Sequence, residues 1–286
     1  MAAVLLALVS AVLFGGMAVA LAFAFRRSPD AEAGALVTGL VALVVTGAFA
    51  LASNAWGGEL WPFLVAGLIA PGGSQLLYVR AVKEVGASRA AVVVGAAPLV
   101  AVTIALTALG EPASAPLLIG AALIVLGGLA LAGERDRPDQ FRAVGLLLAF
   151  GSVVLFATRD NVVRHLAEDT TVDPQLAAAT TVLAGCAVMA AYLLATRGPR
   201  MAGDVRRVFA PFALPGVLWG LSYAALFEAF YRSRVTVVSP LVATEALFGV
   251  LFAAIVLGRS ELIGRHVVAG AALIVAGGVL IGIFRP

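Results

Sequence analysis

Continuously apolar stretches of about 20 residues follow one another along the chain, separated by short polar segments. A helix needs roughly 20 apolar residues to cross about 30 Å of hydrocarbon. The stretches lack the alternation of apolar and polar residues that marks barrel strands, so they predict transmembrane helices. Ten such helices are expected, over residues 3–25, 34–53, 60–80, 88–109, 115–133, 142–166, 175–196, 209–230, 236–257 and 263–284.

One hexapeptide is duplicated. Gly-Ala-Ala-Leu-Ile-Val occupies residues 120–125 and 270–275, and a Gly-Gly pair follows each copy one residue later. Eight of nine positions match at a spacing of 150 residues, which indicates two copies of one structural unit. The small residues form a seam that allows another helix to approach closely, either within the chain or between two protomers of a homodimer.

Weaker matches extend the duplication to other helices. Residues 10–14 match 152–156, and residues 72–75 match 220–223, so the first helix pairs with the sixth and the third with the eighth. Each copy then holds five helices, an odd number, and the second copy must enter the membrane from the opposite side. The pattern predicts an all-α polytopic membrane protein with two inverted repeats, an architecture common among secondary transporters. The expected domains are residues 1–134 and 142–286.

Composition narrows the function further. Apolar residues make up 62% of the chain and charged residues only 12%, with a mean hydropathy of +1.06, so too little polar surface exists to coat a soluble domain. The net charge of +3 comes from arginines at helix ends and does not indicate nucleic-acid binding. The single cysteine, Cys186, excludes an intramolecular disulfide. With one lysine and no phosphate-binding loop, the chain is not expected to hydrolyse ATP, and no cofactor or metal is expected.

The basic residues predict an orientation. Most Lys and Arg residues outside the helices lie in loops that follow odd-numbered helices. Because positively charged loops stay in the cytoplasm, both termini are expected on the outer side of the membrane. The membrane is expected to be the cell membrane, either plasma or inner. Trp56 and Trp61 lie in a loop without Lys or Arg and fit an outer aromatic belt. The other loops and the termini hold only Arg164, Arg232, Arg234 and Arg285.

Several motifs resemble a known family. They are the stretch Ala87-Ser88-Arg89-Ala90-Ala91, the Gly110-Glu111 pair, the duplicated hexapeptide, and the segment from Ser239 to Ala246. Together they resemble the EamA family of the drug/metabolite transporter superfamily over essentially the full chain. The resemblance implies ten helices in two halves and transport of a small molecule, but it identifies no substrate. Family members are usually described with cytoplasmic termini, opposite to the orientation that the arginines predict.

Glu245 is the first candidate for a functional residue, because it lies in the middle of the ninth helix among apolar and small residues. An ionisable side chain at that depth costs about 2.5–3.5 kcal/mol on insertion scales and is a functional hypothesis by default. We expect a proton carrier, or a group that exchanges a proton for a cationic substrate. The alternative is a protonated Glu that hydrogen-bonds a neighbouring helix. Ala97 occupies the equivalent position in the first copy.

The sixth helix carries a second candidate, Arg159-Asp160-Asn161, and Arg159 aligns with Met17 of the first helix. Asp160 and Arg164 are spaced to pair on one helix face. Arg159 would then be left to bind a carboxylate or phosphate with two hydrogen bonds. The alternative is that the sixth helix ends early and this cluster extends to the outer interface.

The third and eighth helices carry a further set of polar candidates. Ser222 and Tyr223 occupy the same repeat positions as Ser74 and Gln75, so the two pairs are expected to face each other and line a cavity. Trp219 is near mid-membrane and is expected in the cavity wall. The alternatives are hydrogen bonds between helices for the polar pairs and contact with lipid for Trp219.

These features predict a secondary transporter, most simply an exporter, of a small metabolite, amino acid or drug that works by alternating access and exchanges protons. Its expected partners are the small-molecule substrate, protons and the lipid bilayer, without nucleic acid. A flippase or scramblase of a lipid-linked substrate is the first alternative. An intramembrane enzyme is the second.

Overall fold

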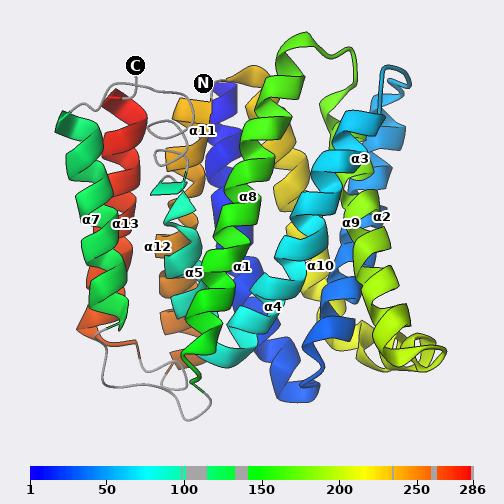
Figure 1. The fold of residues 1–286 in the computed structure, drawn as a ribbon, viewed down its shortest axis with the longest axis horizontal. Helices are drawn as coiled ribbons and strands as arrows, with labels where there is room; N and C mark the ends of the chain where they lie inside the picture. Colours follow the sequence, from blue (N-terminus) through cyan, green and yellow to red (C-terminus); the bar gives the residue numbers. More distant parts are fainter. Residues whose placement is uncertain (98, 101–114, 133–140, 234, 259–262, 285–286) are drawn as a thin grey trace.

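The chain folds into a bundle of helices. The structure is a computed structural model and describes residues 1–97, 99–100, 115–132, 141–233, 235–258 and 263–284. Every element in this part of the chain is helical, as Figure 1 shows. The elements are α1 (Ala2–Arg27), α2 (Ala31–Ser53), α3 (Trp61–Gly67), η1 (Leu68–Gly73), α4 (Ser74–Val85), α5 (Ala87–Val94), α7 (Ala115–Ala132), α8 (Val144–Asp169), α9 (Pro174–Arg197), α10 (Arg200–Arg232), α11 (Val235–Val242), α12 (Glu245–Phe252), η2 (Ala253–Leu257) and α13 (Arg265–Phe284).

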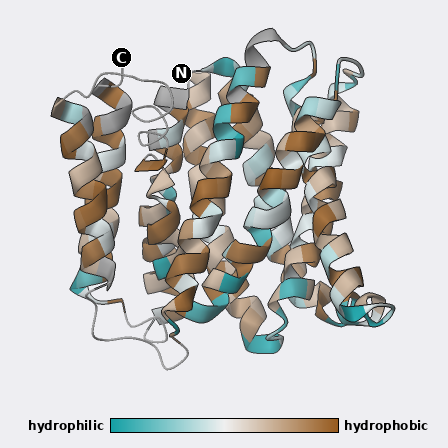
Figure 2. Cartoon of the chain, in the orientation of Figure 1, coloured by the Kyte–Doolittle hydropathy of each residue, from teal (hydrophilic) through white to brown (hydrophobic). Residues whose placement is uncertain are grey.

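The all-α membrane fold expected from the hydropathy pattern is confirmed. Six helical spans are long and apolar enough to cross a bilayer, and three shorter apolar helices cover residues 118–130, 245–257 and 265–280. With α5, they correspond to the ten expected segments, although residues 101–109 of the fourth lie outside the described part. Figure 2 shows hydrophobic residues along the length of the helices and hydrophilic ones mainly at the two ends of the bundle.

Aspartates and glycines mark several helix ends. Asp30 caps α2 by accepting a hydrogen bond of 3.1 Å from the Ala33 amide. Asp173 caps α9 in the same way, 2.9 Å from the Gln175 amide. Such caps satisfy backbone amides that the helix itself leaves without a partner. Gly86, with φ of 87°, forms the sharp turn between α4 and α5, a conformation that favours glycine.

The two halves run in opposite directions. The chain begins and α13 ends at the same end of the bundle, and α8 ends where α1 begins (Figure 1). Contacts between helices repeat in the two halves: α1 packs against α10, and its counterpart α8 packs against α4. The helices α2 and α9, which also correspond, pack against each other. These contacts are those of two units related by a two-fold axis in the membrane plane.

The duplicated hexapeptide packs against its own copy. A Cβ on Gly127 would lie 2.8 Å from the carbonyl oxygen of Gly270, and a Cβ on Gly277 would lie 2.5 Å from that of Gly120. Along this contact the residue number rises in α7 as it falls in α13, so the two helices pack antiparallel. The contacts are reciprocal at a spacing of 150 residues. The small-residue seam therefore packs within the chain.

Two corresponding helices break at the same repeat position. The ninth segment, expected as one helix, is interrupted between α11 and α12, where the amides of Thr244 and Leu247 bond to carbonyls three residues back. The fourth segment has the same bonds at Ala96 and Leu99, 148 residues earlier. Breaks of this kind expose backbone and are tolerated in membranes where they border protein or a cavity.

Candidate functional site

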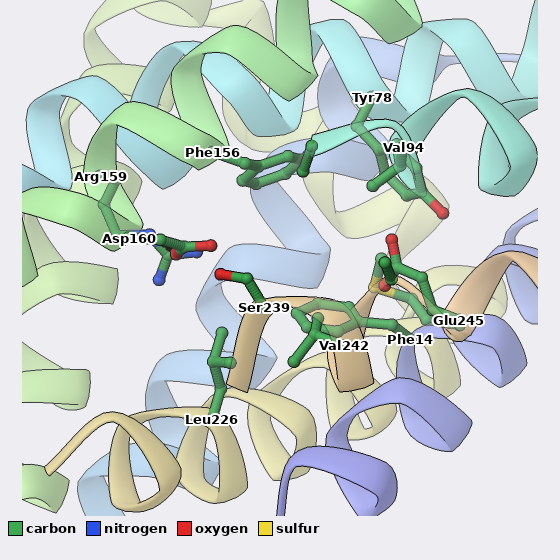
Figure 3. Close-up of a pocket in the computed structure, with 13 residues that line it drawn as sticks. Phe14, Tyr78, Val94, Phe156, Arg159, Asp160, Leu226, Ser239, Val242 and Glu245 are labelled. Carbon is green, nitrogen blue, oxygen red and sulfur yellow. Dashed lines mark ion pairs between the residues drawn. The ribbon is translucent and has the colours of Figure 1, made fainter. Parts of the chain in front are cut away.

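A cavity of about 60 Å³ lies among α1, α4, α5, α8, α10, α11 and α12. The cavity holds room for a few water molecules. Figure 3 shows its labelled side chains converging from these helices. The described residues that line it are Phe14, Met17, Tyr78, Val94, Ala97, Phe156, Arg159, Asp160, Leu226, Ser239, Val242, Ala243 and Glu245.

The cavity lies on the axis between the two repeats. Ten of the thirteen lining residues form five pairs that occupy the same position in the two copies. A space that both members of each pair contact must lie at the pseudo-two-fold axis, because only there do corresponding residues meet. The pairs are Phe14 with Phe156, Met17 with Arg159, Tyr78 with Leu226, Val94 with Val242, and Ala97 with Glu245.

The chemistry of the cavity is asymmetric. At three of the five pairs, one copy has a polar side chain and the other an apolar one. Arg159, Glu245 and Tyr78 are the polar members, opposite Met17, Ala97 and Leu226. The shape of the cavity is therefore symmetric while its charge is not.

Arg159 is buried deep in the bundle, and its guanidinium is paired in charge but only partly hydrogen-bonded, since Nε and Nη1 have no hydrogen-bond partner in the described part of the chain. The residue is 1% exposed, and its guanidinium lies 4.7 Å from the centre of the Tyr223 ring. Arg159 Nε lies 3.0 Å from Oδ1 of Asp160 in an ion pair. Asp160 was expected to pair with Arg164 and leave Arg159 free. That expectation is wrong for Arg159, and the Arg164 side chain lies outside the described residues.

The sixth helix does not end early. The helix α8 continues from Val144 to Asp169, so Arg159 and Asp160 lie well inside it. The side chains of this pair are 2% and 17% exposed, which rules out a cluster extended to the interface.

Glu245 is the first residue of α12, directly after the break, and is 6% exposed. A carboxylate in the first turn of a helix is stabilised by the positive end of the helix dipole. In Figure 3 the Tyr78 hydroxyl points toward Glu245, while Asp160 approaches the cavity from the opposite side. No ion pair joins Glu245 to a cation among the described residues.

Of the polar residues predicted on the third and eighth helices, Ser222 and Gln75 form hydrogen bonds between helices, and none of the set lines the cavity. Ser222 Oγ donates to the carbonyl oxygen of Ser10 at 2.9 Å and also lies 2.9 Å from Ser10 Oγ. Gln75 Nε2 donates to Thr38 Oγ1 at 3.2 Å. Ser74 is buried nearby and does not border the cavity.

Trp219, Tyr223 and Asn161 also lie outside the cavity lining. Trp219 and Tyr223 are fully buried, with their rings edge to face at 5.2 Å, so Trp219 does not face lipid. Tyr223 lies against the Arg159 guanidinium, and Trp219 packs on Tyr223. Asn161 Nδ2 donates to the carbonyl oxygen of Ala157, 2.8 Å away in its own helix. Of nine predicted site residues, the cavity brings together Glu245, Arg159 and Asp160.

The two phenylalanines of the cavity lining were not predicted. Phe14 and Phe156 border the cavity from α1 and α8, and Phe156 packs edge to face with Tyr78 at 6.3 Å. The repeat alignment does contain this signal, because Phe14 and Phe156 end the matched segments 10–14 and 152–156. Among the described residues, no three His, Cys, Asp or Glu side chains form a metal-binding group.

A charged cluster ties four helices together at the end of the bundle opposite the N-terminus. Arg197 of α9 bonds to Asp30 at 2.8 Å, to Glu32 of α2 at 3.0 Å and to Asp204 of α10 at 3.1 Å. Arg80 of α4 joins Glu32 at 3.1 Å. The hydrogen bond from Arg197 holds the pKa of Asp30 below its usual range, against the opposing effect of burial.

Comparison with known proteins gives three results. Residues 1–132 and 143–283 each match the model of the EamA-like transporter family. A solved structure, "Crystal structure of protein", covers 97% of this chain and 95% of its own, with a TM-score of 0.62 and 19% sequence identity. That likeness shows a shared fold. No curated protein sequence matches this chain.

Proposed function

Because the chain belongs to the EamA-like transporter family, we propose that it is a secondary transporter that exchanges a small molecule for a proton at Glu245. The match over nearly the whole chain confirms the resemblance drawn from the motifs and makes the protein an integral membrane transporter. This is not a family of enzymes, so the intramembrane enzyme alternative is wrong. The observation that carries the proposal is a buried carboxylate in a cavity on the repeat axis, with no cationic partner among the residues that the structure describes.

The position of the cavity supports alternating access. Inverted-repeat transporters bind substrate near the midplane, at broken helices between the repeats, and one repeat then moves against the other. Here the breaks after Val94 and Val242 both border the cavity. Its volume of about 60 Å³ is well below the roughly 300–1,000 Å³ of a usual ligand pocket. This conformation is therefore too narrow for a substrate of ordinary size, which enters when helices separate at one end.

Glu245 is suited to coupling because its charge requires compensation. An ionised carboxylate away from water is costly unless it is paired. Glu245 is 6% exposed and forms no ion pair within the described part of the chain. In the empty cavity a proton supplies the compensation, and a bound substrate releases that proton. Because the proton and the substrate both need the Glu245 carboxylate, binding of one displaces the other, and the two are exchanged.

Proteoliposomes that enclose a pH-sensitive dye test this coupling. Gradients of amino acids, amines and carboxylic acids are applied one by one, and proton movement is recorded. We expect at least one solute to drive proton flux in the wild type and in Glu59→Gln, an exposed carboxylate in the loop before α3. Glu245→Gln should abolish the flux. An unchanged pH response in Glu245→Gln contradicts the coupling assignment.

The same vesicles separate the transporter from the flippase alternative. A fluorescent lipid analogue in both leaflets is quenched from outside with dithionite. We expect about half of the fluorescence to persist with and without protein, because only the outer leaflet is accessible. Protein-dependent loss of the protected half would support a flippase or scramblase and contradict solute transport as the primary activity.

A further inference from the structure

We propose that the cavity recognises a monovalent organic cation, a protonated amine or a quaternary ammonium group, in preference to an organic anion. This inference rests on the proposed function, since it names the chemical class of the cargo at the same site. It follows from the charges that line the cavity, from their relative exposure, and from the aromatic side chains around them.

The charges leave one negative unit in excess. Three charged residues line the described part of the cavity: Arg159, Asp160 and Glu245. The ion pair of 3.0 Å between Arg159 and Asp160 cancels two of these charges. Glu245 has no ionic partner among the described residues, so a bound cation restores neutrality and a bound anion doubles the imbalance. In a medium of low dielectric constant this difference is large.

Arg159 is poorly placed to hold an anion. Its side chain is 2% exposed, whereas that of Asp160 is 17% exposed, so the carboxylate is the more accessible member of the pair. The guanidinium is covered by the Tyr223 ring at 4.7 Å and lies 5.7 Å from the centre of the Phe227 ring. The pair therefore exposes more of its carboxylate than of its guanidinium, which disfavours an anion.

The uncharged lining suits an organic cation. Phe14, Tyr78 and Phe156 supply three aromatic rings, and aromatic faces attract ammonium groups. In Figure 3 the Phe14, Phe156 and Ser239 side chains lie between Asp160 on one side and Glu245 on the other. Carboxylates at both ends and rings between them fit a cation with an apolar body better than a metal ion, which requires several oxygen ligands.

Few of the described charged groups on the elements around Glu245 reach the cavity. The helix α12 contacts α1, α5 and α13, and the cavity also borders α4, α8, α10 and α11. Arg89 lies near the start of α5, and Arg265 and His266 begin α13, none of them in the cavity lining. On α1, Arg26 and Arg27 lie at the helix end. The titratable or charged neighbours that share the cavity with Glu245 are Tyr78, Arg159 and Asp160.

Three probes of similar shape test the preference. Benzylammonium, benzyl alcohol and benzoate differ in charge on one aromatic body, and their binding to purified protein in detergent is measured by calorimetry. We expect benzylammonium to bind most tightly and benzoate least. Its affinity should weaken as the pH falls, because proton and cation compete for one carboxylate. Tighter binding of benzoate than of benzylammonium by the wild type would overturn the proposal without any variant.

Two variants assign the effect to the cavity. Glu245→Gln removes the unpaired charge and should weaken benzylammonium binding by about 30-fold or more. Asp160→Asn leaves Arg159 without its partner, so it should weaken the cation and strengthen benzoate. Glu59→Gln is the control and should bind all three probes as the wild type does. Thermal unfolding and gel filtration verify that each variant is folded, and full affinity in folded Glu245→Gln contradicts the proposal.

Flux measurements distinguish failure of this inference from failure of the proposed function. If the protein exchanges protons for another solute but does not bind ammonium probes, the cation preference is contradicted and the proposed transport function stands. If the protein binds benzylammonium through Glu245 but shows no solute-driven proton flux, coupled transport is contradicted and the proposed cation site stands. Binding and flux of benzylammonium, both lost in Glu245→Gln, support the two proposals together.

Discussion

The seam between α7 and α13 gives the sharpest test of the two-fold packing, because neighbouring glycines have opposite surroundings. A Cβ on Gly127 would lie 2.8 Å from both the Gly270 carbonyl oxygen and Cγ1 of Ile274. An ordinary carbon-oxygen contact is about 3.3–3.6 Å, so the helices must separate by at least about half an ångström. On Gly128 the same atom would meet nothing within 4 Å.

The substitutions Gly127→Ala and Gly128→Ala should therefore change stability in opposite directions. Overpacking costs about 1–3 kcal/mol, whereas Ala in an unobstructed helix interior stabilises by about 0.5–1 kcal/mol relative to Gly. Gly277→Ala, with a Cβ 2.5 Å from the Gly120 carbonyl oxygen, should be at least as destabilising as Gly127→Ala. Unfolding in mixed micelles of mild detergent and dodecyl sulfate, followed by circular dichroism, measures each free energy.

The comparison of adjacent positions removes most other causes of instability. Both glycines lie in α7, and both changes add one methyl group, so helix propensity and hydrophobicity change equally. Equal effects of Gly127→Ala and Gly128→Ala would refute the reciprocal seam. A loss of stability confined to Gly128→Ala would place the close contact on the other face of α7, as in a seam between protomers.

Three further outcomes follow from the structure. Arg197→Gln leaves Asp30, Glu32 and Asp204 without their shared cation and should lower the free energy of unfolding by about 1–3 kcal/mol. The loss is smaller than for a fully buried network because the Arg197 side chain is 23% exposed. Thermal unfolding measures the loss, and an unchanged Tm contradicts it. The pKa of Asp30 is lower in the folded than in the unfolded protein. Its contribution to stability is therefore complete above the unfolded value near 3.9 and is lost as the pH falls through the folded value. Asp30→Asn should flatten the acid limb of a curve of stability against pH, and a limb of unchanged slope refutes the assignment. The arginine distribution predicts that Glu59 lies outside the cell and Ser28 in the cytoplasm. In intact cells an impermeant maleimide should therefore label Glu59→Cys but not Ser28→Cys, with the buried Cys186 as background. The reverse pattern would show cytoplasmic termini.

The fold follows from the sequence because its two strongest signals are insensitive to detail. The length of an apolar segment fixes how often the chain crosses the membrane, and the spacing of 150 residues between hexapeptides fixes how the halves correspond. Helix breaks are harder to predict. The interruption before Glu245 depends on which backbone groups face the cavity, and an apolar run of uniform composition does not reveal this.

The candidate site was predictable where burial is costly. Glu245, Arg159 and Asp160 were found because charged groups are rare in apolar helices. Ser222 and Gln75 were expected in the cavity but do not line it in this structure. Each residue along a helix turns the side chain by about 100°. A small error in helix rotation decides between a cavity and the neighbouring helix, where Ser10 and Thr38 bond these two residues. Phe14 and Phe156 gave no signal by composition.

The asymmetry of the cavity leads to a last test, in which the carboxylate is moved across the repeat axis. Ala97 and Glu245 occupy the same repeat position, and both border the cavity. If the charge of the cavity determines cation recognition, Glu245→Ala should lose benzylammonium binding, and the double variant Ala97→Glu/Glu245→Ala should recover much of it. Recovery should be incomplete, since the Tyr78 hydroxyl points toward the original carboxylate (Figure 3). A folded double variant that binds no better than Glu245→Ala would show that the exact position of the carboxylate, and not the charge of a cavity shared by both repeats, determines recognition.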